Sequence, residues 1–168
     1  MRKFLKRIMG RRHPAEHILR RNKPLNDKLS QSLEVYLKEI GAERGCILLE
    51  LIGRPPEVIY QGPSQLEERF PFSRSVVDAV LDEGRGFYCY DSHEEFEAAD
   101  SESLKSQGAR SFVCTPIQRE GLPCGVIYLD NPTSRGMFSQ ANLSDLEAFA
   151  TLISEVLPVG EEPGPQES

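Results

Sequence analysis

The first residues that suggest chemistry are two histidines and a glutamate near the N-terminus, in the segment His13-Pro14-Ala15-Glu16-His17. This H-x-x-E-H spacing occurs in zinc proteases, where the histidines bind the metal and the glutamate acts as the base. Four arginines flank the segment: Arg11, Arg12, Arg20 and Arg21. Their charges repel a divalent cation, and a bare motif match is only a hypothesis. We therefore expect no metal site, and two exposed histidines on a basic segment.

Cysteine is the second candidate for chemistry, as a thiol nucleophile. The sequence has four cysteines and no C-x-x-C pair, which predicts free thiols in a reducing compartment such as the cytoplasm. Cys46, Cys114 and Cys124 lie in apolar runs, where cysteine behaves as a small hydrophobic residue, and Cys89 ends a short strand. A reactive thiol needs a lowered pKa and access to solvent. We expect no catalytic residue, with thiol-dependent redox chemistry as a remote alternative.

Charge is distributed unevenly along the chain. Residues 1–24 contain nine Lys or Arg residues and one acidic residue, a net charge of +8; the whole chain has −6, so the remainder carries −14. The acidic remainder argues against nucleic acid as the ligand. The basic arm has an apolar and a cationic set of side chains that suit docking to an anionic membrane surface or an acidic partner, with a solvated tail as the alternative. These sets are Phe4, Leu5, Ile8 and Met9, and Lys3, Arg7, Arg11 and Arg12.

The same arm lacks a secretory signal, because Lys6 and Arg7 interrupt its apolar residues. No apolar run in the chain approaches the length of a membrane span. We therefore expect the protein in the cytoplasm, or attached from the cytoplasm to the inner face of the membrane.

The hydrophobic pattern predicts one α/β domain over residues 25–157, preceded by the basic arm and followed by a disordered tail, 158–168. Ser73 and Ser139 are the expected N-caps of two helices, and Gly41 ends an earlier one. The expected elements are a helix 27–40, strands 44–52 and 57–61, a helix 74–83, a strand 87–90, a loop 91–109 with one or two short helices, strands 111–118 and 122–130, and a helix from 140 to 157.

Strands 111–118 and 122–130 carry the central structural prediction. They flank Arg119-Glu120-Gly121, as the arms of a hairpin with a three-residue loop would. The second strand is apolar at every position from Val126 to Leu129, which predicts a strand covered on both faces. With this loop Cys114 lies opposite Val126, so a disulfide between Cys114 and Cys124 is not expected.

Three segments in this order resemble the GAF domain family. They are FSRSVVDAVLDEGRGFYCYD (72–91), ARSFVCTPIQREGLPCGVIYLDN (109–131) and FSQANLSDLEAFATLIS (138–154). Within the family, the resemblance is to the GAF sensory domains of bacterial signalling proteins. The resemblance implies an α/β sandwich, with a mainly antiparallel sheet of about five or six strands and helices on both faces.

The resemblance also implies a small-molecule pocket beside the loops of 86–110 and a homodimer formed through the terminal helices. About 24 residues precede the domain and about 11 follow it, so we expect the signal to pass to a separate output protein. The candidate pocket residues are Tyr88, Cys89, Asp91, Arg110, Phe112, Cys114, Tyr128 and Asp130. A pocket combines apolar walls with a few converging polar groups, and Asp91, Arg110 and Asp130 are the polar candidates.

The chain departs from the cofactor-binding members of that family. Bilin-binding members have a histidine directly after the cysteine, whereas Thr115 follows Cys114 and Tyr90 follows Cys89. The cyclic-nucleotide signature is absent from SHEEFEAAD (92–100), and His93 is the only histidine of the domain that haem could use. We therefore expect no cofactor.

We expect a non-enzymatic signalling module that binds a small ligand, a protein partner or both. The first alternative is a scaffold with a degenerate pocket, which docks through its basic arm. The remote alternative is a free methionine sulfoxide reductase, a standalone GAF enzyme whose cysteine motifs this chain matches poorly.

Overall fold

The computed structural model describes four stretches of the chain: residues 12–50, 57–63, 70–92 and 109–158. Several predictions lie outside these residues: most of the basic arm (1–11), most of the 91–109 loop (93–108) and the tail beyond residue 158. Within the described residues, the order and type of every expected helix and strand are as the sequence predicts.

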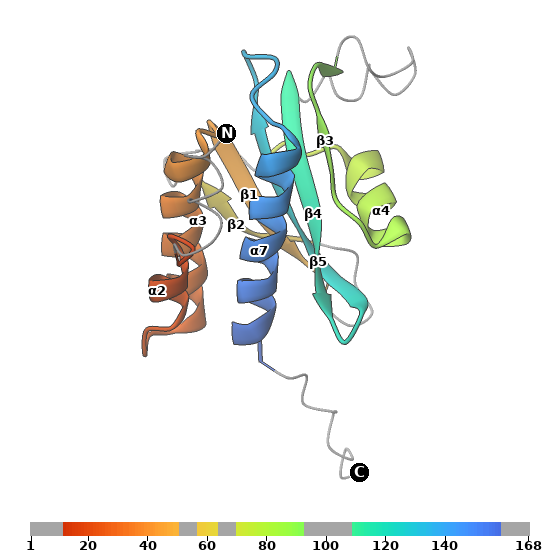
Figure 1. Ribbon diagram of the computed structural model, residues 1–168. Helices are drawn as coiled ribbons and strands as arrows, with labels where there is room; N and C mark the ends of the chain where they lie inside the picture. Colours follow the sequence, from red (N-terminus) through yellow and green to blue (C-terminus); the bar gives the residue numbers. More distant parts are fainter. Residues whose placement is uncertain (1–11, 51–56, 64–69, 93–108, 159–168) are drawn as a thin grey trace.

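The strands form one five-stranded sheet in the order β2-β1-β5-β4-β3, and every neighbouring pair is antiparallel (Figure 1). The strands are β1 (Arg44–Leu49), β2 (Glu57–Gly62), β3 (Phe87–Cys89), β4 (Ser111–Arg119) and β5 (Leu122–Asn131). The hairpin strands β4 and β5 are therefore interior and adjacent, as predicted. β5 occupies the centre of the sheet.

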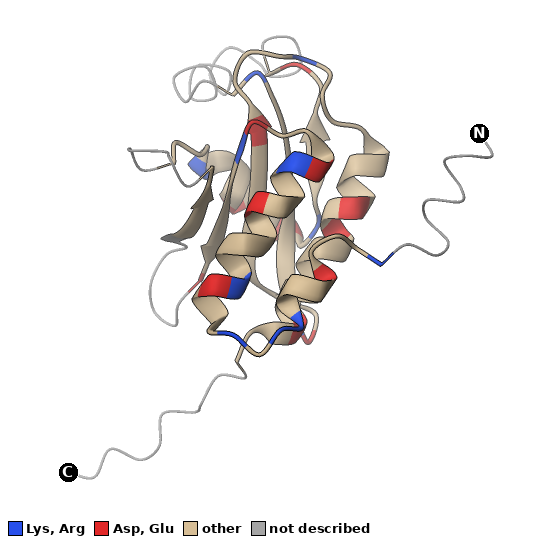
Figure 2. Ribbon diagram, turned by 90° about the vertical axis from the view of Figure 1, so that its left-hand side faces the viewer, with Lys and Arg blue, Asp and Glu red and all other residues tan. Residues whose placement is uncertain are grey.

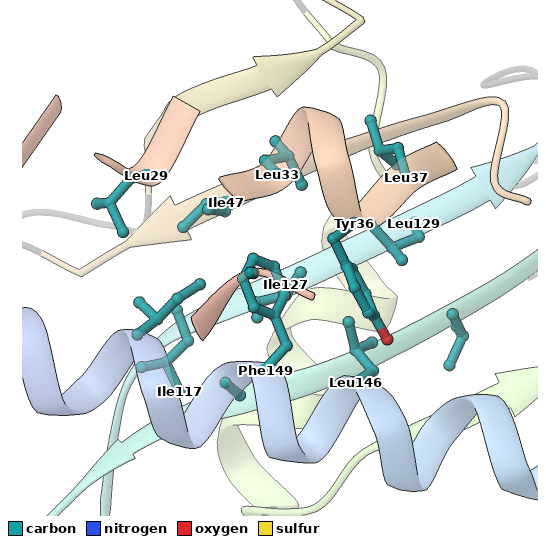
Figure 3. Close-up of a cluster of buried hydrophobic side chains, with 14 of the residues drawn as sticks. Leu29, Leu33, Tyr36, Leu37, Ile47, Ile117, Ile127, Leu129, Leu146 and Phe149 are labelled. Atoms are coloured by element: carbon teal, nitrogen blue, oxygen red, sulfur yellow. The ribbon is translucent and has the colours of Figure 1, made fainter. Parts of the chain in front are cut away.

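Helices cover both faces of the sheet, and each face has its own hydrophobic core. The helices are α2 (Glu16–Leu19), α3 (Leu25–Ile40), α4 (Arg74–Glu83) and α7 (Gln140–Val156). On one face α3 and α7 pack against the sheet, and α2 packs against these two helices. Figure 3 shows Tyr36 and Phe149 between the two long helices and the strands. On the other face α4 packs against the sheet. This α/β sandwich is the predicted fold.

Local signals set the helix ends. The Ser73 hydroxyl accepts a hydrogen bond from the Val76 N–H, and Gly84, with φ of 65°, ends α4 as expected. Gly41, with φ of 77°, ends α3. The start of α3 differs from the predicted 27: the helix begins at Leu25, directly after Pro24, whose backbone is extended. Proline suits a helix start because it has no N–H that would be left without a partner there.

The hairpin register differs from the prediction. The turn has two residues, with Arg119 paired to Leu122, and a bulge follows between Ile117 and Gln118. Each change moves the register by one residue, so Cys114 lies opposite Tyr128 rather than Val126. Because two single shifts restore the alternation of side chains, each residue still faces the predicted side. All four cysteines are free thiols.

The N-terminal part of the described chain contributes to the core. Ala15 and Leu19 are fully buried with α3 and α7, and Ile18 is 5% exposed. His17 is exposed, but the His13 side chain is only 8% exposed. The expectation of two exposed histidines is therefore wrong for His13, and the packed structure begins before residue 25, because α2 buries its apolar side between two helices.

Candidate functional site

The candidate site lies on the α4 face of the sheet, where two cross-strand rows of side chains run side by side. The pairing of β3, β4, β5 and β1 aligns one residue from each strand in every row. The first row is Cys89, Phe112, Asp130 and Arg44, and the second is Phe87, Cys114, Tyr128 and Cys46. Both rows face α4, because most of their members belong to the hydrophobic core on that side.

Asp130 is the charged centre of the first row. Its side chain is fully buried and accepts two hydrogen bonds from Arg44, at 2.6 Å from Nε and 3.2 Å from Nη2. Burial raises the pKa of Asp130 to about 6, although the Arg44 guanidinium opposes the rise. Arg44 also lies over the Phe70 ring, 5.4 Å from its centroid. A buried carboxylate with this pKa is a group that can gain or lose a proton near neutral pH.

A second buried carboxylate lies beyond the ends of β3 and β4. Asp91 is fully buried and accepts a hydrogen bond of 2.7 Å from Arg110 Nη2, and Arg135 Nη1 lies 3.8 Å from the same oxygen. The backbone ties the neighbouring segments together, since the Ser92 N–H donates to the Arg110 carbonyl and the Arg110 N–H donates to the Asn131 carbonyl. With the Arg44–Asp130 pair, this end of the sheet therefore holds three ion pairs among the described residues.

The Tyr128 hydroxyl lies in the second row and makes no hydrogen bond within the described residues. Its ring stacks on Phe112 at 5.6 Å and meets Phe70 edge-on at 5.9 Å. The side chain is fully buried, and burial, with Asp130 next to it, raises the pKa of Tyr128 far above its usual value. A buried hydroxyl without a partner costs free energy, which a bound water or ligand atom can recover.

Three of the four thiols have pKa values that are raised rather than lowered. Burial raises the pKa of Cys46 and of Cys114 above the usual thiol value, and it also raises that of Cys124. The Cys114 Sγ is 3.6 Å from the Phe87 carbonyl oxygen, to which it donates. A nucleophilic cysteine requires a lowered pKa, so these three side chains are placed as packing residues.

Seven of the eight predicted pocket residues come together on or beside the two rows: Cys89, Asp91, Arg110, Phe112, Cys114, Tyr128 and Asp130. Tyr88 does not, because it pairs with Val113, which faces the α7 side of the sheet. The sequence analysis missed Arg44, Arg135 and Phe70. No motif marks these three residues. Strand order brings Arg44 of β1 to Asp130, whereas Arg135 and Phe70 reach the site from loops.

Two hollows in the described surface lie away from these rows. One, of about 240 Å³, lies between α7 and the β3–β4 edge. The other, of about 440 Å³, lies between α4 and the β1–β5 side, with Glu50, Asp78 and Asp82 in its lining. The described residues contain no cluster of metal-ligating side chains.

Solved structures with this fold are numerous, and three illustrate the range. The GAF domain region of a putative membrane protein from Geobacter sulfurreducens is 20% identical, with a TM-score of 0.67 over 79% of this chain and 91% of that one. The free methionine-R-sulfoxide reductase of Neisseria meningitidis is 16% identical, with a TM-score of 0.68 over 84% and 83%. A phycoerythrobilin-bound GAF domain of a cyanobacterial phytochrome is 14% identical, with a TM-score of 0.66 over 85% and 94%. These likenesses establish the fold.

One curated protein shares a shorter similarity. A 68-residue stretch is 37% identical to glutamate–tRNA ligase 1 of Wolinella succinogenes, which is 36% of this chain and 13% of the ligase. The chain thus matches a small part of that enzyme's length. Among the described residues, the helices are too short or too polar to cross a membrane.

The sequence profile of the GAF domain matches residues 24–157. This range contains the whole sheet and the helices α3, α4 and α7. The family match, the strand order and the solved structures agree, and the chain belongs to the GAF domain family.

Proposed function

We propose that this protein is a non-enzymatic signalling module that binds a small ligand on the α4 face of its sheet. The GAF family is one of sensory and signalling ligand-binding modules. The observation that carries the proposal is the Tyr128 hydroxyl, which is buried and without a hydrogen-bond partner in the described structure. It lies one row from the Arg44–Asp130 pair, so apolar walls and polar groups occur together, as they do in ligand sites.

The state of the thiols supports a binding role rather than an enzymatic one. Cys46 and Cys114 are fully buried, and burial raises the pKa of both. Thiol-dependent reduction needs a thiolate that solvent and substrate can reach. The reductase from Neisseria meningitidis shares the fold at 16% identity, and a shared fold alone does not imply a shared activity.

The test is the thermal stability of the full chain with a panel of small polar metabolites. A specific ligand stabilises the folded state by mass action, so a compound that binds the α4 face raises Tm of the wild type. Tyr128→Phe removes the hydroxyl and is expected to abolish most of that rise. Tyr36→Phe is the matched control, because the Tyr36 side chain is also fully buried but faces the α7 side of the sheet.

A scaffold role is the second candidate, and one observation favours it. Aromatic rings already occupy much of the α4 face, since Phe112 packs against Tyr128 on one side and Phe87 on the other. A panel in which no compound shifts Tm would favour this role. The protein would then act through contacts with a partner or a second copy.

The basic arm is the proposed docking element in either role. Its cations suit an anionic membrane surface or an acidic partner, at about 1 kcal/mol for each basic residue near the surface. Sedimentation with vesicles that contain or lack anionic lipid distinguishes docking to a membrane surface from docking to an acidic partner. We expect co-sedimentation of the full chain with anionic vesicles only, and its loss when Lys3, Lys6 and Arg7 are changed to Gln.

A further inference from the structure

The segment His13–Leu19 lies across the two long helices on the α7 face. It contacts both α3 and α7 and buries Ala15 and Leu19 in their shared core. The residues that follow it, 20–24, are all exposed and connect it to α3. The segment is thus an apolar strip held by side chains and joined to the domain by an exposed hinge.

His13 is the polar anchor of this strip. Its ring lies parallel to Phe149 of α7, with centroids 5.4 Å apart and an interplanar angle of 4°. It also meets the Tyr36 ring of α3 at 5.0 Å, and the Tyr36 and Phe149 rings lie 4.5 Å apart, so the three rings contact one another. One imidazole therefore contacts both helices, and the side chain is 8% exposed.

The hydrogen bonds of the segment fix the charge state in which His13 fits. The Ala15 N–H donates to His13 Nδ1 at 3.2 Å, so Nδ1 carries no proton and the neutral ring holds its proton on Nε2. The Nε2 atom is buried without a hydrogen bond inside the described structure, 3.9 Å from Asp145 Oδ2. A second proton would have to enter at Nδ1, where it would meet the Ala15 N–H.

We propose that His13–Leu19 is a pH-sensitive latch, which closes over α3 and α7 when His13 is neutral and detaches when His13 is protonated. Closing holds residues 13–19, in the later part of the basic arm, against the two helices. Opening frees this segment and uncovers the Tyr36 and Phe149 rings. The device lies on the face opposite the proposed ligand site, so it does not depend on that site.

The charges around His13 determine the direction of the response. Burial lowers the pKa of His13 below its usual value, while Asp145 of α7, Glu39 of α3 and Glu16 of the segment itself oppose this and raise it. Tyr36 is neutral, because burial raises its pKa. Since the docked ring has the lower pKa, protons favour the detached state. Docking is therefore complete above the free value of about 6.5 and weakens as the pH falls below it.

Amide hydrogen exchange on the full chain measures the latch directly. Ile18 and Leu19 donate to the Ala15 carbonyl at 3.1 and 3.0 Å, so their amides report docking. Between pH 7.5 and pH 5.5 we expect their protection factors, corrected for the intrinsic rate, to fall roughly tenfold. The amides of Val126 to Leu129 in β5 should keep their protection, because the sheet does not open.

Variants separate the latch from general acid sensitivity. His13→Phe keeps an aromatic ring that does not titrate, so the fall in the protection of Ile18 and Leu19 at low pH should disappear. His17→Gln is the matched control, because His17 lies in the same segment but is exposed, and it should keep the fall. Asp145→Asn removes an attraction to protonated His13, so the fall should be at least as large as in the wild type.

Three results would overturn the proposal. One is wild-type protection of Ile18 and Leu19 that does not change with pH. Another is a fall that persists in His13→Phe. The third is simultaneous loss of protection in β5, which would show that acid acts on the whole fold. If residues 13–19 of the His13→Phe variant do not dock at pH 7.5, the Asp145→Asn variant provides the test instead. A fall in the protection of Ile18 and Leu19 that is smaller in Asp145→Asn than in the wild type would contradict the latch.

Discussion

The turn between β4 and β5 contains two consecutive residues with positive φ, Glu120 at 51° and Gly121 at 78°. This is the backbone of a type I′ hairpin turn, in which Asn-Gly is the preferred pair. Glutamate is strained in this conformation, whereas asparagine tolerates it. We expect Glu120→Asn to raise the free energy of unfolding by about 0.5–1 kcal/mol, measured as a higher urea midpoint with an unchanged m-value.

Gly121→Ala is the control at the same turn. A Cβ at Gly121 would meet nothing within 4 Å, so any loss comes from the backbone alone. We expect a loss of about 1 kcal/mol. Midpoints equal to wild type in both variants would contradict a turn of this type.

The Arg44–Asp130 pair gives a second prediction at the residue scale. Arg44→Met leaves a buried carboxylate without its partner, which costs about 3 kcal/mol at pH 7.5. The pKa of Asp130 is already about 6 beside Arg44 and rises further without it, so at pH 5 the carboxyl takes up a proton. The loss relative to wild type should therefore be smaller at pH 5 than at pH 7.5 in urea unfolding.

Asp130 also makes the stability of the wild type depend on pH. The folded pKa of about 6 lies above the ordinary value of 3.8, so the folded state binds this proton more tightly. The contribution of Asp130 to stability is full below about pH 4 and declines as the pH rises through 6. Asp130→Asn removes this dependence, and the double variant with Arg44→Met should lose less than Arg44→Met alone at pH 7.5. An equal loss would contradict the pairing.

At the scale of elements, β1 and β5 approach closely at Gly125. A Cβ built there would lie 2.5 Å from the Leu48 carbonyl oxygen of β1. Backbone atoms cannot move aside without shifting a central strand, so we expect Gly125→Ala to cost about 2–3 kcal/mol. Thermal unfolding measures the loss. Val126→Ala at the next position removes side-chain volume without this clash, and an unaltered Tm in Gly125→Ala would contradict the tight contact.

The elements differ in how far local residues determine them. Helix α4 runs from Arg74 to Glu83, as the sequence predicts, because a serine cap and a left-handed glycine are local signals. The alternation of a strand also places Tyr88 and Cys89 on opposite faces, but the pocket that the resemblance implies was defined only by its position beside the loops of 86–110, without regard to face. The burial of His13 was not predictable, since it depends on a groove that two distant helices form.

For the candidate site, sequence reasoning located the strands but not the ion pairs. Asp130 and Asp91 were expected as polar groups near the pocket. Arg110, also an expected polar group, pairs with Asp91, whereas Arg44 and Arg135 were not expected. Arg135 lies in a loop, and only the order β1-β5-β4-β3 brings Arg44 to Asp130. Side-chain pairing across a sheet depends on strand order, which no single segment encodes.

At the scale of the molecule, the outward surface of the helical layer determines how two copies could meet. Figure 2 shows acidic and basic residues interspersed along α3, which favours contact with solvent. The exposed side of α7 has fewer charged residues, namely Asp145, Glu147 and Glu155, and contains the small residues Ala141, Ser144 and Ala148. We therefore place the proposed homodimer contact on α7, with a two-fold axis that brings the same patch of both copies together.

Ala148→Arg tests this contact on the full chain. A two-fold axis near α7 places the two introduced charges close together in a water-poor contact, so we expect a shift from dimer to monomer in sedimentation velocity. Because Ala148 is exposed in the single chain, the far-UV spectrum should not change. The matched control is Leu122→Arg, at a side chain that is 72% exposed at the start of β5, next to the β4–β5 turn. A wild type that sediments as a monomer would contradict the proposed dimer. If Leu122→Arg is instead the variant that dissociates, the α7 contact is wrong and the β4–β5 turn becomes the candidate interface.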